Sequence, residues 1–594
     1  MTFEIGLVLI IIAVAIVLFI SERLPIDTVA IIVMALFLVT GILTPAEGLA
    51  GFSNPATITV GAMFIVSASI FKSGALSSVG TLLTRIGRKN YLLCLLAVML
   101  VSGGLSAFIN DTAVVALLMP VLIQVCRDTK ISPAKLLMPL SFGSLMGGVC
   151  TLIGTSTNIL VSGIAEAQGV EPLRMFDFTP AGIFFLAAGI LYMFFIGRHL
   201  LPNRKHTQDL TEDFGMGDYL TEIILLPDSP SVGMPLQSSG LIQNLDIDVL
   251  QITRDKKFKL KATPYTMLRA NDILKVRCDV EKLKKLKEEK GIELKSERKF
   301  QDKDLRGNNT KLYEAIVTPS SYMQGKSLKE LDFRTYNHGA TVLAIRHRDE
   351  ILHEKLTHVK LSSGDVLLIS ADKEQAEKLR YNEDILLISE RERSAYDYTK
   401  IIPVMIISAG IVMSAAIGLA PIVISSLVGV LLLVLFRCIE VTEVYKFIDW
   451  KVIFMLAGVL SMGAALEKTG AASLLSGLLI DVIGEYGPRV LLSVFFFITF
   501  VFTNFMSNNA TAALLAPIAI VAAKDLGLSP KPFLMAVTYA ASLSFMTPMG
   551  YQTNTMIYGP GNYRFSDYLK VGTPLNLLLW LLASIILPWF FPFE

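Results

Sequence analysis

Residues 106–120 read SAFINDTAVVALLMP, and residues 503–517 read TNFMSNNATAALLAP. Each stretch places amides, hydroxyls or a carboxyl inside an otherwise apolar run, and counting back from the prolines aligns residues 110–112 with residues 507–509. Asp111 is the only charged residue between positions 101 and 126. A polar group in such a run is costly unless it is used, so both stretches are candidates for a functional site.

The composition is that of a membrane protein. Hydrophobic residues make up 53% of the 594 residues and charged residues only 18%, against roughly a quarter charged in soluble proteins. The net charge of +2 gives no reason to expect a nucleic-acid partner. The five cysteines are scattered and form no CxxC pair, which predicts ordinary buried thiols. The first apolar run follows no basic segment and precedes no cleavage site, so we expect it to be a retained membrane span.

The apolar sequence falls into two halves, residues 1–202 and 399–594, which repeat one pattern. Gly154 and Gly550 open related motifs (550 − 154 = 396), and the Ser-Gly pair at 73 matches the Thr-Gly pair at 469 (469 − 73 = 396). The apolar pieces beside each polar stretch are shorter than the roughly 20 residues that a span needs. We therefore predict an α-helical polytopic membrane protein of two inverted repeats, each with a re-entrant hairpin lined by protein or a wet cavity.

A second feature of each half is an interruption after the hairpin. Residues 147–158 contain glycines, hydroxyls and an amide within an uncharged apolar segment, which predicts a helix broken at mid-membrane. Before each hairpin, residues 72–89 and 470–486 are expected to form amphipathic segments at the membrane interface.

The two halves are separated by a soluble insert, residues 203–398, which is rich in Lys, Glu and Asp and contains no spanning run. It has a repeat of its own, since Gly233 matches Gly325 (325 − 233 = 92) and Asp272 matches Asp365 (365 − 272 = 93). Alternating apolar residues between turns predict short strands, so we expect two α/β modules, 203–300 and 301–398. Residues 282–290 are expected to form a solvated helix. Residues 383–388 are either a further repeat fragment or one more strand.

Paired interrupted segments in two repeats are typical of secondary transporters, in which broken helices surround a central site. Helix N-termini favour anions, whereas unwound carbonyls, hydroxyls and amide oxygens are hard ligands that suit Na⁺. One site could therefore hold an anion together with its coupling cations. Other interpretations stay open: the polar residues can simply join helices, the glycines can simply permit close packing, and Asp111 can be a structural carboxyl.

These motifs resemble the divalent-anion:sodium symporter family of the ion-transporter superfamily, which carries a Ser-Asn-Thr motif at the tip of each hairpin and a helix break after it. The resemblance covers nearly all of residues 1–202 and 399–594. It implies sodium-coupled symport of a small divalent anion, sulfate or a C4-dicarboxylate, by an elevator-like homodimer whose amphipathic segments link scaffold and moving domains. The implied substrate-binding residues are Asn110, Asp111, Thr112, Thr155, Ser507, Asn508, Asn509 and Tyr551, and the implied sodium ligands are Ser106, Asn110, Asp111, Gly154, Thr503, Met506 (main chain), Asn508 and Gly550.

The tips depart from the family motif, because the first reads Asn-Asp-Thr and the second Ser-Asn-Asn. An ionised Asp111 would repel an anion beside it, so Asp111 either faces a cation or is protonated, and a proton is the alternative coupling ion. A proton-coupled inorganic-anion transporter or exporter is therefore the main alternative function. A potassium channel would need a repeated filter strand, and only the fragment at residues 59–62 occurs. The apolar part contains no constellation typical of an enzyme.

Each module of the insert resembles the TrkA-C (RCK-C) domain of potassium-conductance regulators, over most of residues 215–392. The resemblance implies cytosolic domains that bind a nucleotide or cyclic dinucleotide and bias the transport cycle; the alternative is a scaffold that stabilises the dimer and binds nothing. No Rossmann unit precedes the modules, because residues 215–217 lack the third glycine of the fingerprint. We expect an integral protein of the plasma (inner) membrane with a cytoplasmic insert.

Overall fold

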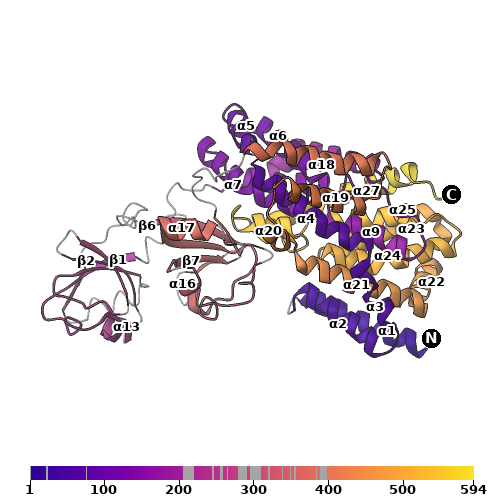
Figure 1. Cartoon of the computed structure of the whole chain (residues 1–594). Coiled ribbons are helices and arrows are strands. Elements are labelled where there is room, and N and C mark those ends of the chain that lie inside the picture. Colours follow the sequence, from indigo (N-terminus) through magenta and orange to yellow (C-terminus); the bar gives the residue numbers. More distant parts are fainter. Residues whose placement is uncertain are drawn as a thin grey trace. The chain divides into compact units, whose positions relative to one another are not determined.

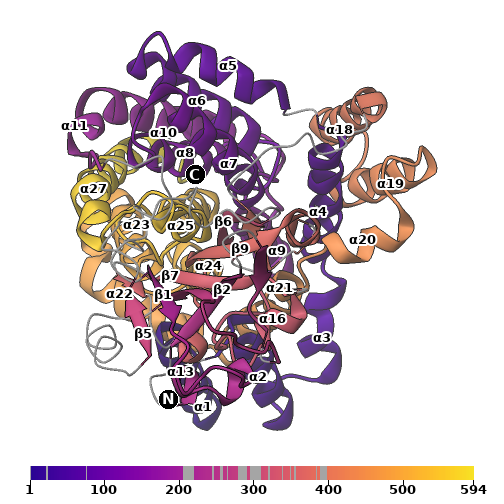
Figure 2. The same ribbon diagram turned by 90° about the vertical axis from the view of Figure 1, so that its left-hand side faces the viewer.

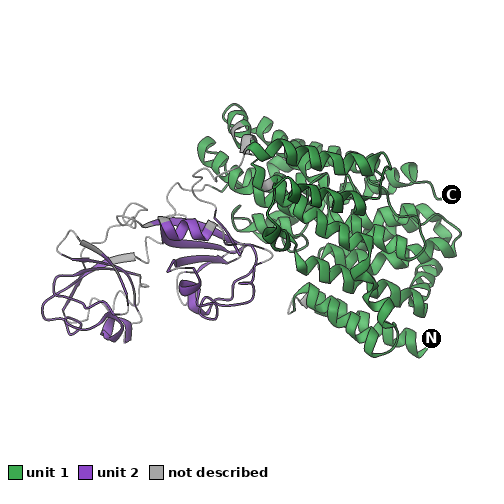
Figure 3. Ribbon diagram, in the orientation of Figure 1, with its two compact units in different colours: residues 1–204, 391–594 green, residues 205–390 purple. Residues whose placement is uncertain are grey.

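The computed structural model describes residues 2–21, 24–74, 77–204 and 398–594, together with residues 220–387 apart from 244–246, 255–257, 264, 278–290, 295–309, 319–320, 338, 348–349, 353–355, 381 and 383. The chain forms two compact units. One is made of residues 1–204 and 391–594 and is helical, and the other is made of residues 205–390 and contains the strands (Figure 3).

The helical unit is built from two series of helices in the same order. The first series is α1 (Phe3–Ser21), α2 (Ile26–Val39), α3 (Pro45–Ser53), α4 (Pro55–Ser73), α5 (Ser77–Gly87), α6 (Tyr91–Ser106), α7 (Asp111–Thr129), α8 (Ala134–Gly148), α9 (Ser156–Ala167) and α10 (Thr179–Tyr192), continued by η1 (Met193–Gly197) and α11 (Arg198–Leu200). The second series is α18 (Ile401–Ala416), α19 (Ile422–Leu435), α20 (Val441–Phe447), α21 (Trp450–Thr469), α22 (Ala471–Ile483), α23 (Pro488–Thr503), α24 (Asn508–Asp525), α25 (Lys531–Ser542), α26 (Gln552–Tyr558) and α27 (Phe565–Phe590), with the short turns η5 (Tyr398–Lys400) and η6 (Gly484–Tyr486). The predicted repeat is therefore a repeat of structure.

The two series contact each other reciprocally. Helix α2 of the first series packs against α21 of the second. Helix α19, the counterpart of α2, packs against α4, and α19 and α4 lie side by side in both Figure 1 and Figure 2. Glu47 in α3 pairs with Lys468 in α21 at 2.6 Å, and the equivalent residues Glu443 and Lys72 pair in the opposite direction. Such crossed pairs are the signature of a pseudo-two-fold relation between repeats.

Several helices are long and apolar enough to cross a bilayer. Within the described residues, five meet the length and hydropathy of a span: Pro45–Ile70, Asp111–Thr129, Thr179–Leu200, Trp450–Thr469 and Phe565–Phe590. Shorter apolar helices lie at Phe3–Phe19, Ile26–Val39, Tyr91–Ser106, Ile401–Ala416, Ile422–Leu435 and Pro488–Thr503. The chain has the fold of a polytopic membrane protein with an insert, as the sequence predicted.

The first hairpin differs from its prediction in the length of its second limb. We expected the apolar pieces beside the polar stretch to be too short for a span, whereas α7 runs without a break from Asp111 through Pro120 to Thr129. Asp111 and Thr112 occupy the first turn of α7, where side chains that accept hydrogen bonds from backbone N–H groups are stable. Pro120 removes only one helical hydrogen bond and does not end the helix. The polar residues therefore belong to the tip and not to the middle of a limb.

Within its described residues, the insert contains two antiparallel sheets of five strands each. The first consists of β1 (Leu220–Leu225), β2 (Asp248–Arg254), β3 (Phe258–Lys261), β4 (Ile273–Arg277) and β5 (Ile292–Leu294), and the second of β6 (Thr310–Val317), β7 (Thr341–His347), β8 (Glu350–Leu352), β9 (Val366–Asp372) and β10 (Ile385–Leu387). Their orders are β3-β2-β4-β1-β5 and β8-β7-β9-β6-β10, so each strand has a counterpart. Short helices complete the described part: η3 (Leu236–Ser238), α13 (Gly240–Gln243), α16 (Phe333–Tyr336), η4 (Leu356–His358) and α17 (Lys373–Arg380).

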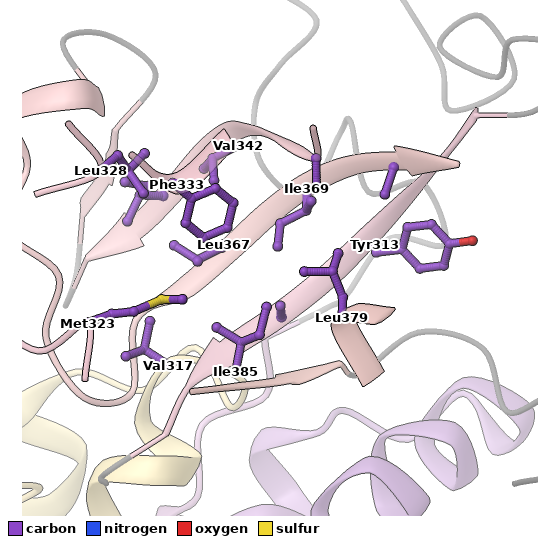
Figure 4. Packing of buried hydrophobic residues seen from close by; sticks show 14 of the residues in the cluster. Tyr313, Val317, Met323, Leu328, Phe333, Val342, Leu367, Ile369, Leu379 and Ile385 are labelled. Atoms are coloured by element: carbon purple, nitrogen blue, oxygen red, sulfur yellow. The ribbon is translucent and has the colours of Figure 1, made fainter. Parts of the chain in front are cut away.

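The likeness of the two sheets extends to their irregularities. The register shifts at Val249/Gln251 in β2 and at Val342/Ala344 in β7. The second sheet packs Leu367 and Ile369 of β9 against Phe333 and Leu379 (Figure 4). Residues 385–387, left open by the sequence, form strand β10 beside β6 and correspond to β5. The predicted helix at residues 282–290 lies outside the described residues.

Candidate functional site

The tip of the first hairpin is the turn between α6 and α7. Asn110 caps α7, since its side-chain oxygen accepts a hydrogen bond from the N–H of Thr112 at 3.0 Å. Asp111 is 1% exposed. Its Oδ1 accepts from the N–H of Thr112 at 2.7 Å, and its Oδ2 accepts from the hydroxyl of Tyr551. The one carboxylate of the predicted site is therefore buried and surrounded by donors.

The tip of the second hairpin is uncharged. Ser507 caps α24, with its Oγ 3.3 Å from the N–H of Ala510. Asn508 donates to Thr157 Oγ1 at 2.7 Å, and the side-chain oxygen of Asn509 accepts from the same Thr157 hydroxyl at 3.0 Å. The second tip is thus held by α9, a helix of the first repeat.

Each predicted helix break is present. Helix α8 ends at Gly148 and α9 begins at Ser156, and in the second repeat α25 ends at Ser542 and α26 begins at Gln552. Two equivalent asparagines hold the unwound segments. Asn158 donates to the carbonyl of Thr151 at 2.7 Å, and Asn554 donates to the carbonyl of Ser544 at 2.9 Å. These side-chain bonds replace the helical bonds that the break removes.

The tips and breaks meet across the two repeats. The hydroxyl of Thr112 lies 3.3 Å from the side-chain oxygen of Gln552, and Thr155 and Tyr551 join their hydroxyls at 2.7 Å. Thr155 and Tyr551 are themselves equivalent (551 − 155 = 396) and precede α9 and α26. A residue can touch its own repeat equivalent only close to the axis that relates the repeats. The site therefore lies on the pseudo-two-fold axis.

Oxygen atoms gather beside Gly148 in the first repeat. A Cβ placed on Gly148 would lie 3.2 Å from the carbonyl of Gly154, 3.3 Å from Ser106 Oγ and 3.4 Å from Asp111 Oδ2. Ser106 Oγ is buried and has no hydrogen-bond partner in the part of the chain that the structure describes. A carboxylate, a carbonyl and an unpartnered hydroxyl around one point are a donor set that fits a small hard cation.

A weaker version of this arrangement lies beside Gly550. A Cβ there would meet Ser544 Oγ, would lie 2.9 Å from Thr547 Oγ1 and 3.0 Å from the carbonyl of Thr503. The Thr503 hydroxyl donates its proton to the carbonyl of Ala541 at 2.8 Å and keeps its oxygen lone pairs for a ligand. This second group contains no carboxylate.

The predicted residues are brought together at the tips and breaks. Asn110, Asp111, Thr112, Thr155 and Tyr551 form one connected group, and Asn508 and Asn509 contact α9 beside it. Met506 is buried in the second tip, where its backbone N–H donates to the carbonyl of Phe502.

Sequence reasoning missed several polar side chains that complete the tips and breaks. They are Ser156, Thr157, Gln552, Asn504, Ser544 and Thr547. The sequence does contain one feature that could have identified them: each is a polar residue at the start of, or inside, an interrupted apolar segment.

Comparison with known proteins places the chain among transporters. A family model described as citrate transporter matches residues 16–528. The chain belongs to the citrate transporter family. It is 38% identical to an uncharacterized transporter of Synechocystis sp. over 98% of this chain and 97% of that protein. It is 32% identical to an uncharacterized transporter of Escherichia coli over 99% of both chains.

More distant relatives have names that state a substrate. Sodium/sulfate cotransporter 1 of Chlamydomonas reinhardtii is 22% identical over 92% of this chain and 85% of its own length. The chain is therefore an integral membrane transporter and not an enzyme. It carries out secondary transport of an anion.

Proposed function

We propose that this transporter carries a small divalent anion, sulfate or a C4-dicarboxylate, by symport with Na⁺, and that the anion lies between the two hairpin tips. The observation that carries the proposal is the meeting of an uncharged, donor-rich second tip with a first tip whose single carboxylate belongs to an oxygen cluster. Sulfate is favoured because the distant relatives are named sodium/sulfate cotransporters.

The anion part rests on helix ends and neutral donors. Helices α7, α9 and α24 begin at Asp111, Ser156 and Asn508, and hydrogen bonds link these three starts to one another or to Tyr551. Exposed backbone N–H groups and the helix dipole make such ends favourable for anions. Thr112, Ser507 and Asn509 would supply further donors. A neutral site suits an anion that must be released at the end of the cycle.

The cation part rests on the cluster beside Gly148. Asp111 Oδ2, the carbonyl of Gly154 and Ser106 Oγ would hold one Na⁺, with Asn110 adjacent. Bound there, the ion supplies a positive charge that offsets the Asp111 carboxylate beside the anion. The second predicted ion, held by the Thr503 carbonyl and by Gly550 and Asn508, would gain Thr547 and Ser544 as side-chain partners. The Met506 carbonyl is the main-chain ligand proposed beside them.

A proton is the alternative coupling ion, and the burial of Asp111 is what favours it. A buried carboxylate on a transport path is a common proton carrier. The donors around Asp111 favour the ionised form instead, because a carboxylate accepts hydrogen bonds from Tyr551 and Thr112 without a proton of its own.

The proposal extends to the oligomeric state, the moving parts and the role of the insert. The transporter would act as a homodimer in the plasma membrane, with α5 and α22 as the arms between a fixed and a moving domain. The insert would face the cytoplasm, and its two equivalent sheets would act as TrkA-C-like sensors of a nucleotide or cyclic dinucleotide, or as a dimer scaffold.

Uptake by the purified full-length protein in liposomes tests the proposal. Labelled sulfate and labelled succinate are offered with an inward Na⁺ gradient, with choline in place of Na⁺, and with an inward proton gradient. The proposal predicts that Na⁺ stimulates uptake of one of the two anions. Uptake driven by the proton gradient and indifferent to Na⁺ would contradict sodium coupling, and uptake of neither anion would contradict the substrate class.

A further inference from the structure

Tyr551 makes the two repeats unequal, because its repeat equivalent is Thr155, which has a much shorter side chain. Its hydroxyl bonds Thr155 Oγ1 at 2.7 Å and also bonds Asp111 Oδ2. Asn508 of the second tip instead donates to Thr157 of α9, two residues after Thr155. One side chain of the second repeat thus bonds both the break and the hairpin tip of the first repeat.

The direction of these hydrogen bonds is fixed by chemistry when Asp111 is ionised. A carboxylate can only accept, so the Tyr551 hydroxyl must donate to Asp111 Oδ2. The phenol oxygen then remains free to accept, and the Thr155 hydroxyl donates to it. The result is a directed chain from Thr155 through Tyr551 to Asp111, closed to water because Tyr551 and Thr155 are 5% and 1% exposed.

Asp111 Oδ2 takes part in two arrangements, a hydrogen bond and the oxygen cluster. It accepts the Tyr551 hydrogen bond, and it is the carboxylate oxygen that faces Ser106 Oγ and the Gly154 carbonyl beside Gly148. A cation in that cluster withdraws electron density from Oδ2 and weakens the bond from Tyr551. The phenol proton then has a better acceptor in an anion between the tips.

We propose that the Tyr551 hydroxyl couples the two ligands: it donates to Asp111 while the cation cluster is empty, and to the transported anion once a cation coordinates Asp111. The inference rests on the proposed function and adds a positioning residue to it. Without the cation, the anion would meet both an uncompensated carboxylate and an occupied donor. Tyr551 therefore links cation binding in the first repeat to the broken helix α26 of the second.

The coupling factor is the quantity that separates this role from a structural one. It is the ratio of the anion dissociation constants without and with saturating Na⁺, measured by calorimetry on purified full-length protein with sulfate and with succinate. Linkage requires that the anion raises Na⁺ affinity by the same factor, so a second titration checks the first. A variant that only loosens the fold weakens both bindings but leaves their ratio unchanged.

Tyr551→Phe removes the hydroxyl and keeps the ring. We expect its coupling factor to fall roughly tenfold, the size expected for a lost hydrogen bond to a charged group. Tyr539→Phe is the matched control, because the Tyr539 hydroxyl is equally buried but donates to the carbonyl of Phe178 at 2.5 Å, away from the tips. The control should keep the wild-type factor.

The outcomes are separable. A folded Tyr551→Phe protein with the wild-type factor overturns the inference while leaving sodium symport intact. A wild-type protein that binds the anion with a factor of one overturns the proposed sodium coupling itself. If Tyr551→Phe does not fold, Thr155→Val takes its place, because it removes the hydroxyl that completes the chain. A lowered factor there supports the inference, and an unchanged factor overturns it.

Discussion

The two transmembrane repeats share their architecture but not their chemistry. Each has the same order of helices, the same turn after the same hairpin, and an asparagine that holds its break, Asn158 in one and Asn554 in the other. The charge differs, because Asp111 stands at the first tip where Asn508 stands at the second. The two repeats therefore share one geometry, while the difference between the tips places the one charged ligand on the first side and neutral ligands on the second.

Filling the oxygen cluster of the first repeat should have the largest effect on transport. In Gly148→Ala the new Cβ would lie 3.2 Å from the carbonyl of Gly154, 3.3 Å from Ser106 Oγ and 3.4 Å from Asp111 Oδ2, in the space that the cation would occupy. We expect uptake to be lost. Gly104→Ala in helix α6 is the control, because nothing lies within 4 Å of its new methyl group and uptake should persist. Normal Na⁺-driven uptake by Gly148→Ala would exclude a cation beside Gly148.

Removing the one charge should separate the two tips. Asp111→Asn keeps the shape of the side chain and removes the negative ligand, so we expect the Na⁺ concentration for half-maximal uptake to rise roughly a hundredfold. Asn508→Ala at the equivalent position should instead raise the KM for the anion about tenfold, and its effect on Na⁺ dependence should be smaller than that of Asp111→Asn because it removes a neutral ligand. Radiolabelled uptake at varied Na⁺ and varied anion distinguishes the two. Equal effects of both variants on both constants would show that the tips are not specialised.

The insert offers a smaller comparison of the same kind. Asp272 accepts two hydrogen bonds from Arg254, at 2.8 and 2.7 Å, whereas the equivalent Asp365 has His347 at 2.9 Å. A two-bond arginine pair is the stronger interaction, so Asp272→Asn should cost about 3 kcal/mol, the lower end for breaking a buried pair, and Asp365→Asn less. Hydrogen exchange on the full chain measures opening of β4 and β9 separately. Greater loss of protection in β9 would contradict this ranking.

The crossed ion pairs should matter least. Lys468 and Glu47 are each less than half exposed yet lie at the surface, so Lys468→Ala should lower the midpoint of thermal unfolding only slightly, and even less in high salt. Lys72→Ala tests the equivalent pair with Glu443. Thermal unfolding of both variants at low and high salt is the measurement. A large or unequal loss would mean that the two halves of the pseudo-two-fold interface are not equivalent.

The sequence predicted those features that repetition makes visible. The separation of 396 residues placed Gly154 and Gly550 in equivalent breaks, and the polar stretches marked both tips. It could not predict the contact of Asp111 with Tyr551 or of Asn509 with Thr157, because these depend on how one repeat docks against the other.

The one error has a local cause. The apolar pieces of the first hairpin were predicted to be short because the polar residues between them were counted as an interruption, whereas Asp111 and Thr112 form the first turn of α7, which continues through Pro120. The error concerns where backbone hydrogen bonds begin, which a single sequence does not specify.

The most direct test of the account is to locate the transported anion. Crystals of the full-length protein grown with Na⁺ and an anomalously scattering substrate, selenate for sulfate or bromosuccinate for a dicarboxylate, would show its position. The account predicts one peak between residues 110–112 and 507–509, within hydrogen-bonding distance of the Tyr551 hydroxyl. A substrate peak elsewhere in the helical unit, with the tips in contact only with each other, would contradict it.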